Sequence, residues 1–153
     1  MSSDNRKNLQ QELGMEIRAL QTAVDSFDAA AAERLGVNRT DLHALDVLMQ
    51  RESAAPSELG AALGLTTGSV TALLDRLDKL GYVTRSPDPK DRRKSVVRPT
   101  PEAVRAVGEL FGPLAEDGFR QVARYTAEQL ELLLDFLRSS RRLQEEHLDR
   151  IRP

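Results

Sequence analysis

The sequence contains no cysteine and no tryptophan, and only 4% of its residues are aromatic. Without cysteine the chain can form no disulfide, no thiolate metal site and no thiol redox switch. No apolar run approaches the roughly 18 residues that a membrane-spanning helix needs, and the N-terminal residues lack the apolar core of a signal peptide. We therefore expect a cytoplasmic protein with no membrane partner and no cofactor.

Patterns that indicate catalysis or metal binding are also missing. The sequence has no glycine-rich phosphate loop, and no nucleophile accompanied by a histidine base and a third orienting group. Its two histidines, His43 and His147, lie far apart, and no cysteine could complete a coordination shell around either of them. These absences argue against an enzyme and against a metal sensor.

Positive charge is concentrated in one segment of a chain whose formal net charge is −2. From Arg76 to Arg98 there are eight basic residues and three acidic ones, which gives a local charge of +5. Phosphate contacts depend on where positive charge is gathered more than on the net charge. This segment is therefore a candidate footprint for nucleic acid.

The first half of the chain follows a helical pattern. The 153 residues, 40% of them hydrophobic, fit one compact domain. Apolar residues recur at steps of three and four along residues 9–27, which predicts a first helix. A break is expected at residues 35–37, after which Thr40 is placed to cap a second helix that ends near Arg51.

Two shorter helices are predicted next. Pro56 is suited to the first turn of a third helix, and Gly64 should end it. Thr66 is placed to cap a fourth helix with a strongly apolar face, and Gly81 supplies its C-terminal stop. This fourth segment shows the clearest helical period in the chain.

A hairpin and two more helices complete the expected fold. Residues 82–85 and 95–98 are β-prone runs separated by a proline- and aspartate-rich turn. Thr100 should cap a helix that Gly112-Pro113 kinks, and Thr126 begins a capping-box pattern for the last helix. The chain is thus expected to be mainly helical with one small β-hairpin.

Two helices joined by a tight turn and followed by a basic hairpin are typical of a winged helix-turn-helix. Outside its apolar stripe the fourth helix carries short, mostly hydroxyl-bearing side chains, which fit a DNA major groove roughly 12 Å wide. Arg76 is placed to contact the phosphate backbone, and the hairpin tip to reach the adjacent minor groove. The DNA contacts predicted on this basis are Thr66, Thr67, Ser69, Thr71, Ala72, Arg76, Lys90, Arg92, Arg93 and Lys94.

A protein-interaction module is the alternative function. Such a winged helix would hold another protein on the same surface and would not bind DNA directly. The alternative needs apolar anchors on that surface, and residues 67–76 offer few of them. The basic hairpin also favours the DNA-binding hypothesis.

The segment that begins at Ser57 carries a family resemblance. It reads SELGAALGLTTGSVTALLDRLDKLGYVTRSPDPKDRRKSVVRPT. Together with the helical segments around it, this stretch resembles the MarR family of bacterial regulators over about residues 13–148. DPKDRR followed by a short strand and a threonine is similar to that family's wing, which implies that Asp91 braces the hairpin and Arg93 enters the minor groove. The sequence departs from the family at RPTPEA, where Pro99 and Pro101 are expected to stiffen the exit from the wing.

The flanking helices point to a homodimer. The apolar stripe on residues 9–27 and the last helix together present more apolar surface than a small winged helix can cover, and a two-fold interface is the simplest way to bury it. The expected dimerisation segments are residues 5–35 and 101–150. The resemblance implies the same, because the first and last helices of two subunits intertwine in that family. We therefore expect a single domain, residues 1–153, in which a winged helix-turn-helix lobe at residues 38–99 lies between dimerisation helices.

The resemblance also implies how the protein would be regulated. It indicates a repressor that occupies a pseudo-palindromic operator and is released by a small aromatic or amphipathic ligand. The family's ligand pocket lies between the DNA-binding lobe and the dimerisation helices, and His43 and Asp46 fall near that level. These two residues are the candidate ligand contacts, whereas Phe27, Phe111 and Phe119 are better explained as core residues.

Overall fold

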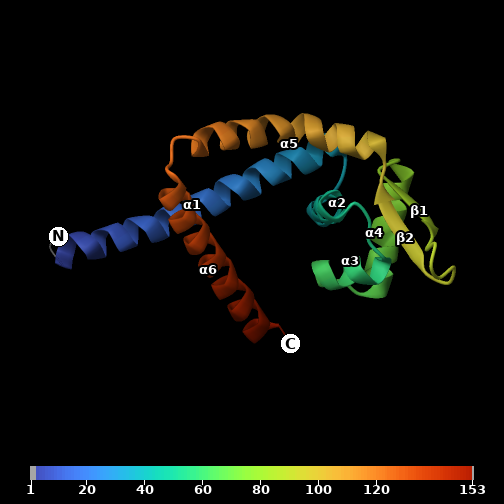
Figure 1. The fold of residues 1–153 in the computed structure, drawn as a ribbon. Coiled ribbons are helices and arrows are strands. Elements are labelled where there is room, and N and C mark those ends of the chain that lie inside the picture. The colour runs from blue at the N-terminus through green and yellow to red at the C-terminus, as the bar shows by residue number, and fades with distance from the viewer. Residues whose placement is uncertain (1–2, 153) are drawn as a thin grey trace. The chain divides into compact units, whose positions relative to one another are not determined.

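The computed structural model describes residues 3–152, which form a mainly helical fold with one antiparallel hairpin (Figure 1). This arrangement confirms the expected fold class. None of the described helices combines the length and the apolarity that crossing a membrane requires. In chain order the elements are α1 (Ser3–Leu35), α2 (Arg39–Arg51), α3 (Pro56–Leu63), α4 (Thr67–Lys79), β1 (Val83–Pro87), β2 (Ser95–Pro99), α5 (Pro101–Val122) and α6 (Ala127–Ile151).

Glycine ends α1 at the predicted break. Gly36 has a φ of 70°, a conformation that L-residues with a side chain rarely adopt. The N–H of Gly36 donates to the carbonyl of Glu33 at 3.1 Å, and the N–H of Val37 donates to the carbonyl of Ala32 at 3.0 Å. This pair of hydrogen bonds is the Schellman motif, which satisfies carbonyls that the last turn of a helix leaves open.

The prediction that Thr40 caps the second helix is wrong. Asn38 is the N-cap, and its side-chain oxygen accepts a hydrogen bond from the N–H of Asp41 at 2.8 Å. Asparagine caps at least as well as threonine, and starting at the earlier residue adds Arg39 and Thr40 to the helix. The other predicted caps, Thr66 of α4, Thr100 of α5 and Thr126 of α6, are confirmed.

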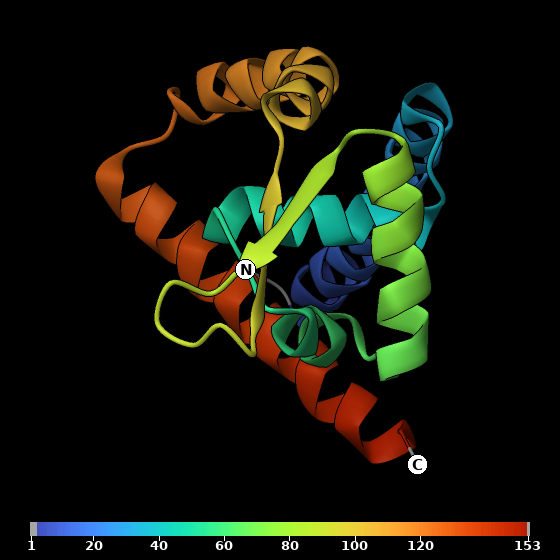
Figure 2. The ribbon, with the colours of Figure 1, turned by 90° about the vertical axis from the view of Figure 1, so that its right-hand side faces the viewer.

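The apolar core lies within the winged-helix part of the chain. It joins α2, α3 and α4 to both strands and to the start of α5, and Figure 2 shows the wing on one side of α3 and α4 on the other. The connection between α2 and α3 also takes part, because Ala54 exchanges two backbone hydrogen bonds with Val97 of β2, at 2.8 and 3.0 Å. The core residues are Ala44, Leu45, Val47, Leu48, Ala54, Leu59, Val70, Leu73, Leu74, Leu77, Val83, Val97 and Ala103.

The described chain divides into two compact units between Leu110 and Phe111, inside α5. The helix itself continues through Gly112-Pro113, where the sequence predicts a kink. The second unit holds the rest of α5 together with α6, and α6 has no buried residue. The functional grouping into a lobe at residues 38–99 and dimerisation segments at residues 5–35 and 101–150 stays a prediction.

One aromatic residue differs from its expected place. The sequence predicts Phe119 in the core, and this prediction is wrong for the protomer, because the residue is 80% exposed. Phe27 and Phe111 are half-buried. Periodicity predicts which face of a helix is apolar, but it does not say whether the same chain covers that face.

Candidate nucleic-acid interface

Tight packing against α3 positions α4. A Cβ added to Gly60 of α3 would lie 3.2 Å from the carbonyl oxygen of Leu65 and 3.3 Å from a methyl carbon of Val70, so glycine allows the two helices to approach closely. Thr66 then starts α4, with its hydroxyl oxygen accepting from the N–H of Ser69 at 3.3 Å. The residues that α4 buries are Val70, Leu73, Leu74 and Leu77.

Burial of that stripe leaves the short polar side chains of α4 on the solvent side. The hydroxyl of Thr71 donates to the carbonyl of Thr67 at 3.1 Å, and the hydroxyl of Thr66 donates to that of Ser69 at 3.0 Å. Each of these side chains still has a free acceptor position, so the face can accept hydrogen bonds without rearrangement. The exposed predicted contacts on this surface are Thr66, Thr67, Ser69, Thr71 and Ala72.

Two aspartates organise the tip of the hairpin. The carboxylate of Asp91 accepts from the N–H of Arg93 at 3.1 Å, and the carboxylate of Asp88 accepts from the N–H of Lys90 at 2.8 Å. Backbone hydrogen bonds close the loop, from Lys94 to the Asp91 carbonyl at 2.9 Å and from Asp88 to the Lys94 carbonyl at 2.8 Å. Such side-chain turns restrict the backbone of a loop. They place Arg93 inside the turn from Asp91 to Lys94.

The four basic side chains of the tip face solvent. Lys90, Arg92, Arg93 and Lys94 are all exposed. Within residues 3–152, no carboxylate lies at ion-pair distance from any of them. A cation that has no protein partner can exchange its solvent counterions for a phosphate at little cost.

The base of the hairpin is instead tied to α4 by a paired arginine. Arg85 of β1 donates to Asp75 at 2.8 Å and to Asp78 at 3.2 Å. The hydrogen bonds that Arg85 donates to these two carboxylates raise the pKa of its guanidinium, so its charge is firmly held. Sequence reasoning missed this contact, although a strand arginine that follows two aspartates on an exposed helical face was a signal for it.

Arg76, a predicted phosphate contact, has a protein partner. Its Nε and Nη2 atoms donate to the two carboxylate oxygens of Asp41 at 3.0 and 2.7 Å. The hydrogen bonds that Arg76 donates to Asp41 are the largest cause that raises the pKa of Arg76. Asp41 is a functional candidate that the sequence did not reveal, because an aspartate in a first helical turn is explained locally by the helix dipole.

The candidate ligand residues His43 and Asp46 both lie on the exposed side of α2. Asp46 accepts a hydrogen bond from the side-chain amide of Gln50 at 3.0 Å. In the part of the chain that the structure describes, no group of three histidine, aspartate or glutamate side chains could hold a metal ion. Neither His43 nor Asp46 lines the cleft that lies between the wing and the connection from α2 to α3, which is described next.

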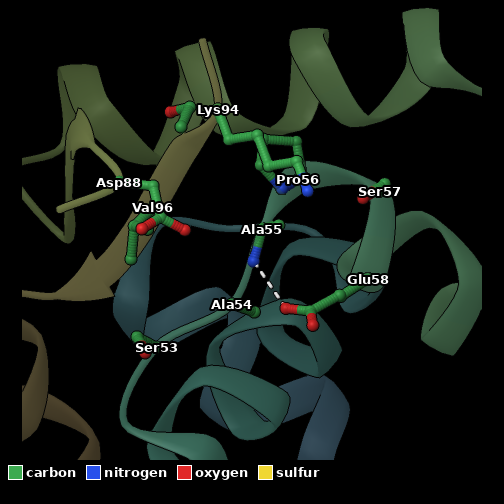
Figure 3. Close-up of a pocket in the computed structure, with 10 residues that line it drawn as sticks. Ser53, Ala54, Ala55, Pro56, Ser57, Glu58, Asp88, Lys94 and Val96 are labelled. Atoms are coloured by element: carbon green, nitrogen blue, oxygen red, sulfur yellow. Dashed lines mark hydrogen bonds between the residues drawn. The ribbon is translucent and has the colours of Figure 1, made fainter. Parts of the chain in front are cut away.

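That cleft of about 490 Å³ lies between the wing and the connection from α2 to α3 (Figure 3). On the helical side, the carboxylate of Glu58 is held by the N–H of Ala55 at 2.7 Å, which Figure 3 shows as a dashed line. Among the residues that line the cleft, Lys94 is the one with a basic side chain. The lining residues are Ser53, Ala54, Ala55, Pro56, Ser57, Glu58, Asp88, Lys94, Ser95 and Val96.

Several known proteins are similar to this chain in sequence or in fold. A sequence profile described as MarR family matches residues 35–94. The HTH-type transcriptional regulator YcgE of Bacillus subtilis is 39% identical over 153 residues, which is 99% of each chain. Among solved structures, YusO of B. subtilis has a TM-score of 0.61 at 23% identity and covers 94% of this chain and 99% of its own. A MepR mutant of S. aureus bound to an oligodeoxyribonucleotide has a TM-score of 0.61 at 18% identity, with 84% and 94% covered.

Proposed function

The chain belongs to the MarR family of DNA-binding transcriptional regulators, which are not enzymes. On this premise we propose that, in a complex with its operator, α4 enters the major groove and the wing tip reaches the adjacent minor groove. The observation that carries this proposal is the contrast in pairing within residues 3–152: the tip cations have no carboxylate at ion-pair distance, whereas Arg85 at the base has two. The MepR mutant bound to an oligodeoxyribonucleotide shows that a protein with this fold can engage DNA.

Within the wing, Arg93 is the minor-groove residue and Asp91 is its brace. The hydrogen bond from the Arg93 N–H to the Asp91 carboxylate holds the backbone from which the guanidinium extends. A narrow minor groove has an enhanced negative potential, which attracts arginine. Lys90, Arg92 and Lys94 add phosphate contacts, which strengthen binding without reading the base sequence.

The regulator acts as a homodimer. Large apolar side chains of α1, α5 and α6 are exposed in the protomer, and an isologous interface would remove them from water. A two-fold dimer places its two recognition helices about 34–36 Å apart on a pseudo-palindromic site. The exposed residues that support this proposal include Leu9, Leu13, Leu20, Val24, Leu114, Phe119, Leu133, Leu134 and Leu137.

Regulation by a small molecule completes the proposal. The dimer represses its promoter and is released by an aromatic or amphipathic ligand near His43 and Asp46. For release, the ligand must bind the conformation that does not fit DNA more tightly. A tenfold loss of operator affinity requires about 1.4 kcal/mol of difference between the two states.

The direct test is Arg93→Ala in gel-shift titrations at fixed salt with the promoter fragment of the protein's own gene. We expect about a tenfold loss or more, since one specific arginine contact contributes roughly 1–3 kcal/mol. Arg92→Ala is the matched control, because it removes the same charge from the neighbouring exposed position and should cost less. An unchanged affinity in Arg93→Ala would refute the minor-groove role, and equal losses in both variants would reduce it to general charge attraction.

A further inference from the structure

We propose that Arg76 supports DNA binding as a positioning residue, which orients α4 through its paired hydrogen bonds to Asp41 and does not contact a phosphate. This inference rests on the proposed entry of α4 into the major groove. It replaces the phosphate role that the sequence alone suggests for Arg76. It also gives Asp41, a residue of α2, a part in operator recognition.

The two partners are buried to very different extents. The side chain of Asp41 is 2% exposed, whereas that of Arg76 is 48% exposed. The contact is bidentate, with Nε to Oδ2 at 3.0 Å and Nη2 to Oδ1 at 2.7 Å. Two parallel hydrogen bonds between planar groups set both the distance and the relative orientation of those groups. The bridge therefore constrains how α4 is rotated and tilted against α2.

The bridge joins oppositely polarised helix ends. Asp41 lies in the first turn of α2 and Arg76 in the last turn of α4. A carboxylate is favoured near a helix N-terminus and a guanidinium near a C-terminus, so each helix stabilises its own half of the pair. Figure 2 shows the beginning of α2 running against α4. The N–H of Asp41 is in turn held by the Asn38 cap.

Among the described residues, the side-chain hydrogen bonds between α2 and α4 are those of the Asp41–Arg76 pair. The buried face of α4 consists of Val70, Leu73, Leu74 and Leu77, and apolar burial depends little on orientation. Arg85 connects α4 to the wing, but it does so through the exposed side of the helix. The pair of Asp41 and Arg76 thus adds a directional contact with α2 to the apolar packing that holds α4 against α3.

A phosphate role for Arg76 conflicts with the burial of Asp41. A phosphate that bound Nε and Nη2 would take the N–H groups that satisfy both carboxylate oxygens, whereas Nη1 donates to neither of them. Losing those N–H groups would leave a charged group without a partner at a 2% exposed position, which is strongly unfavourable. The wing cations carry no such cost, because the described residues provide them with no carboxylate.

The two roles predict opposite results for Asp41→Asn. If Arg76 only orients α4, the loss of one ionic partner weakens DNA binding, and we expect at least a fivefold loss. Arg76→Gln should weaken binding to a similar extent, and neither variant should change the slope of log K against log salt. If Arg76 instead binds phosphate, Asp41→Asn frees it and tightens binding, while Arg76→Gln lowers the salt slope by about one ion.

The experiment uses the full chain and a duplex that the wild-type protein selects from a random-sequence pool. Affinity is measured by fluorescence anisotropy at several salt concentrations. Asp25→Asn is the matched control, because it also breaks an aspartate–arginine pair, with Arg39 at 2.8 Å, but one in which both partners are exposed. We expect wild-type affinity for this control. The proposal would be overturned if Asp41→Asn bound the duplex as tightly as the wild-type protein or more tightly. It would also be overturned if Arg76→Gln reduced the slope of log K against log salt.

A second variant keeps the test decisive if Asp41→Asn does not fold. In Asp41→Leu/Arg76→Met both charges are replaced by apolar groups, which commonly preserves stability where breaking one half of a buried pair does not. A folded double variant that binds the duplex weakly with an unchanged slope supports the proposal, and one that binds as tightly as wild type overturns it. If the wild-type protein retains no duplex at all, the proposed function itself fails.

Discussion

The winged-helix part of the chain and the last helix show the same helical periodicity, but their apolar faces are buried to very different extents. In α4 the apolar residues are packed against α2, α3 and the hairpin of the same chain. In α6, which is almost twice as long, no residue is buried, and seven large apolar side chains are exposed. The comparison teaches that an apolar stripe identifies a contact face, while the identity of its partner depends on the rest of the molecule.

The largest expected effect concerns the exposed face of α6. We expect Leu134→Asp/Leu137→Asp to convert a dimer into a monomer, because two carboxylates cannot be buried in an apolar interface without partners. Size-exclusion chromatography with light scattering measures the mass of the wild-type protein and of the variant. The control is Glu131→Gln/Asp135→Asn, on the same exposed helix. A wild-type protein that is already monomeric would break the comparison, since α6 would then have no partner.

The next effect concerns the buried face of α4. Leu77→Ala should lower the free energy of unfolding by about 2–5 kcal/mol, because it removes a leucine that is fully buried in the core and leaves a cavity. Urea denaturation followed by circular dichroism measures the change. Leu80→Ala, three residues further along at a position that is 43% exposed, should cost far less. Equal losses at the two positions would mean that burial in the protomer does not distinguish them.

The smallest effect compares two matching N-caps. Thr66 and Thr126 each accept a hydrogen bond from the N–H three residues later at 3.3 Å. Replacing either by alanine should cost about 1 kcal/mol. We expect the first turn of α6 to lose more hydrogen-exchange protection than the first turn of α4, because core packing also holds α4 in place. A larger loss in α4 would show that α6 is held by contacts beyond its own turns.

Several features of the fold could be predicted because they depend on nearby residues. The stop at Gly36, the caps at Thr66 and Thr126 and the hairpin after Gly81 all follow from backbone chemistry within about four positions. Asn38 and Thr40 are both good caps, and choosing between them required the backbone conformation itself. The wing cations could likewise be predicted from local sequence, because they are adjacent in the chain.

The contacts that could not be predicted join residues distant in sequence. Asp41 and Arg76 are 35 positions apart, and each has a sufficient local explanation as a charge favoured at its own helix end. Arg85 could be counted as a basic residue, but its attachment to Asp75 and Asp78 depends on how β1 leaves α4. Phe119 shows the reverse case, in which a residue typical of a core is exposed in the protomer.

By itself the sequence determined the helices, most of their caps, the basic wing and the family to which the chain belongs. These properties follow from short-range hydrogen bonding, apolar periodicity and charge, all of which can be read along the chain. Only the tertiary structure decided which of the arginines near α4 are free and which are paired. Pairing depends on carboxylates that tertiary packing brings close: Asp41 of α2 for Arg76, and Asp75 and Asp78 of α4 for Arg85 of β1. Burial of Asp41 underlies our proposal that one of those pairs constrains α4.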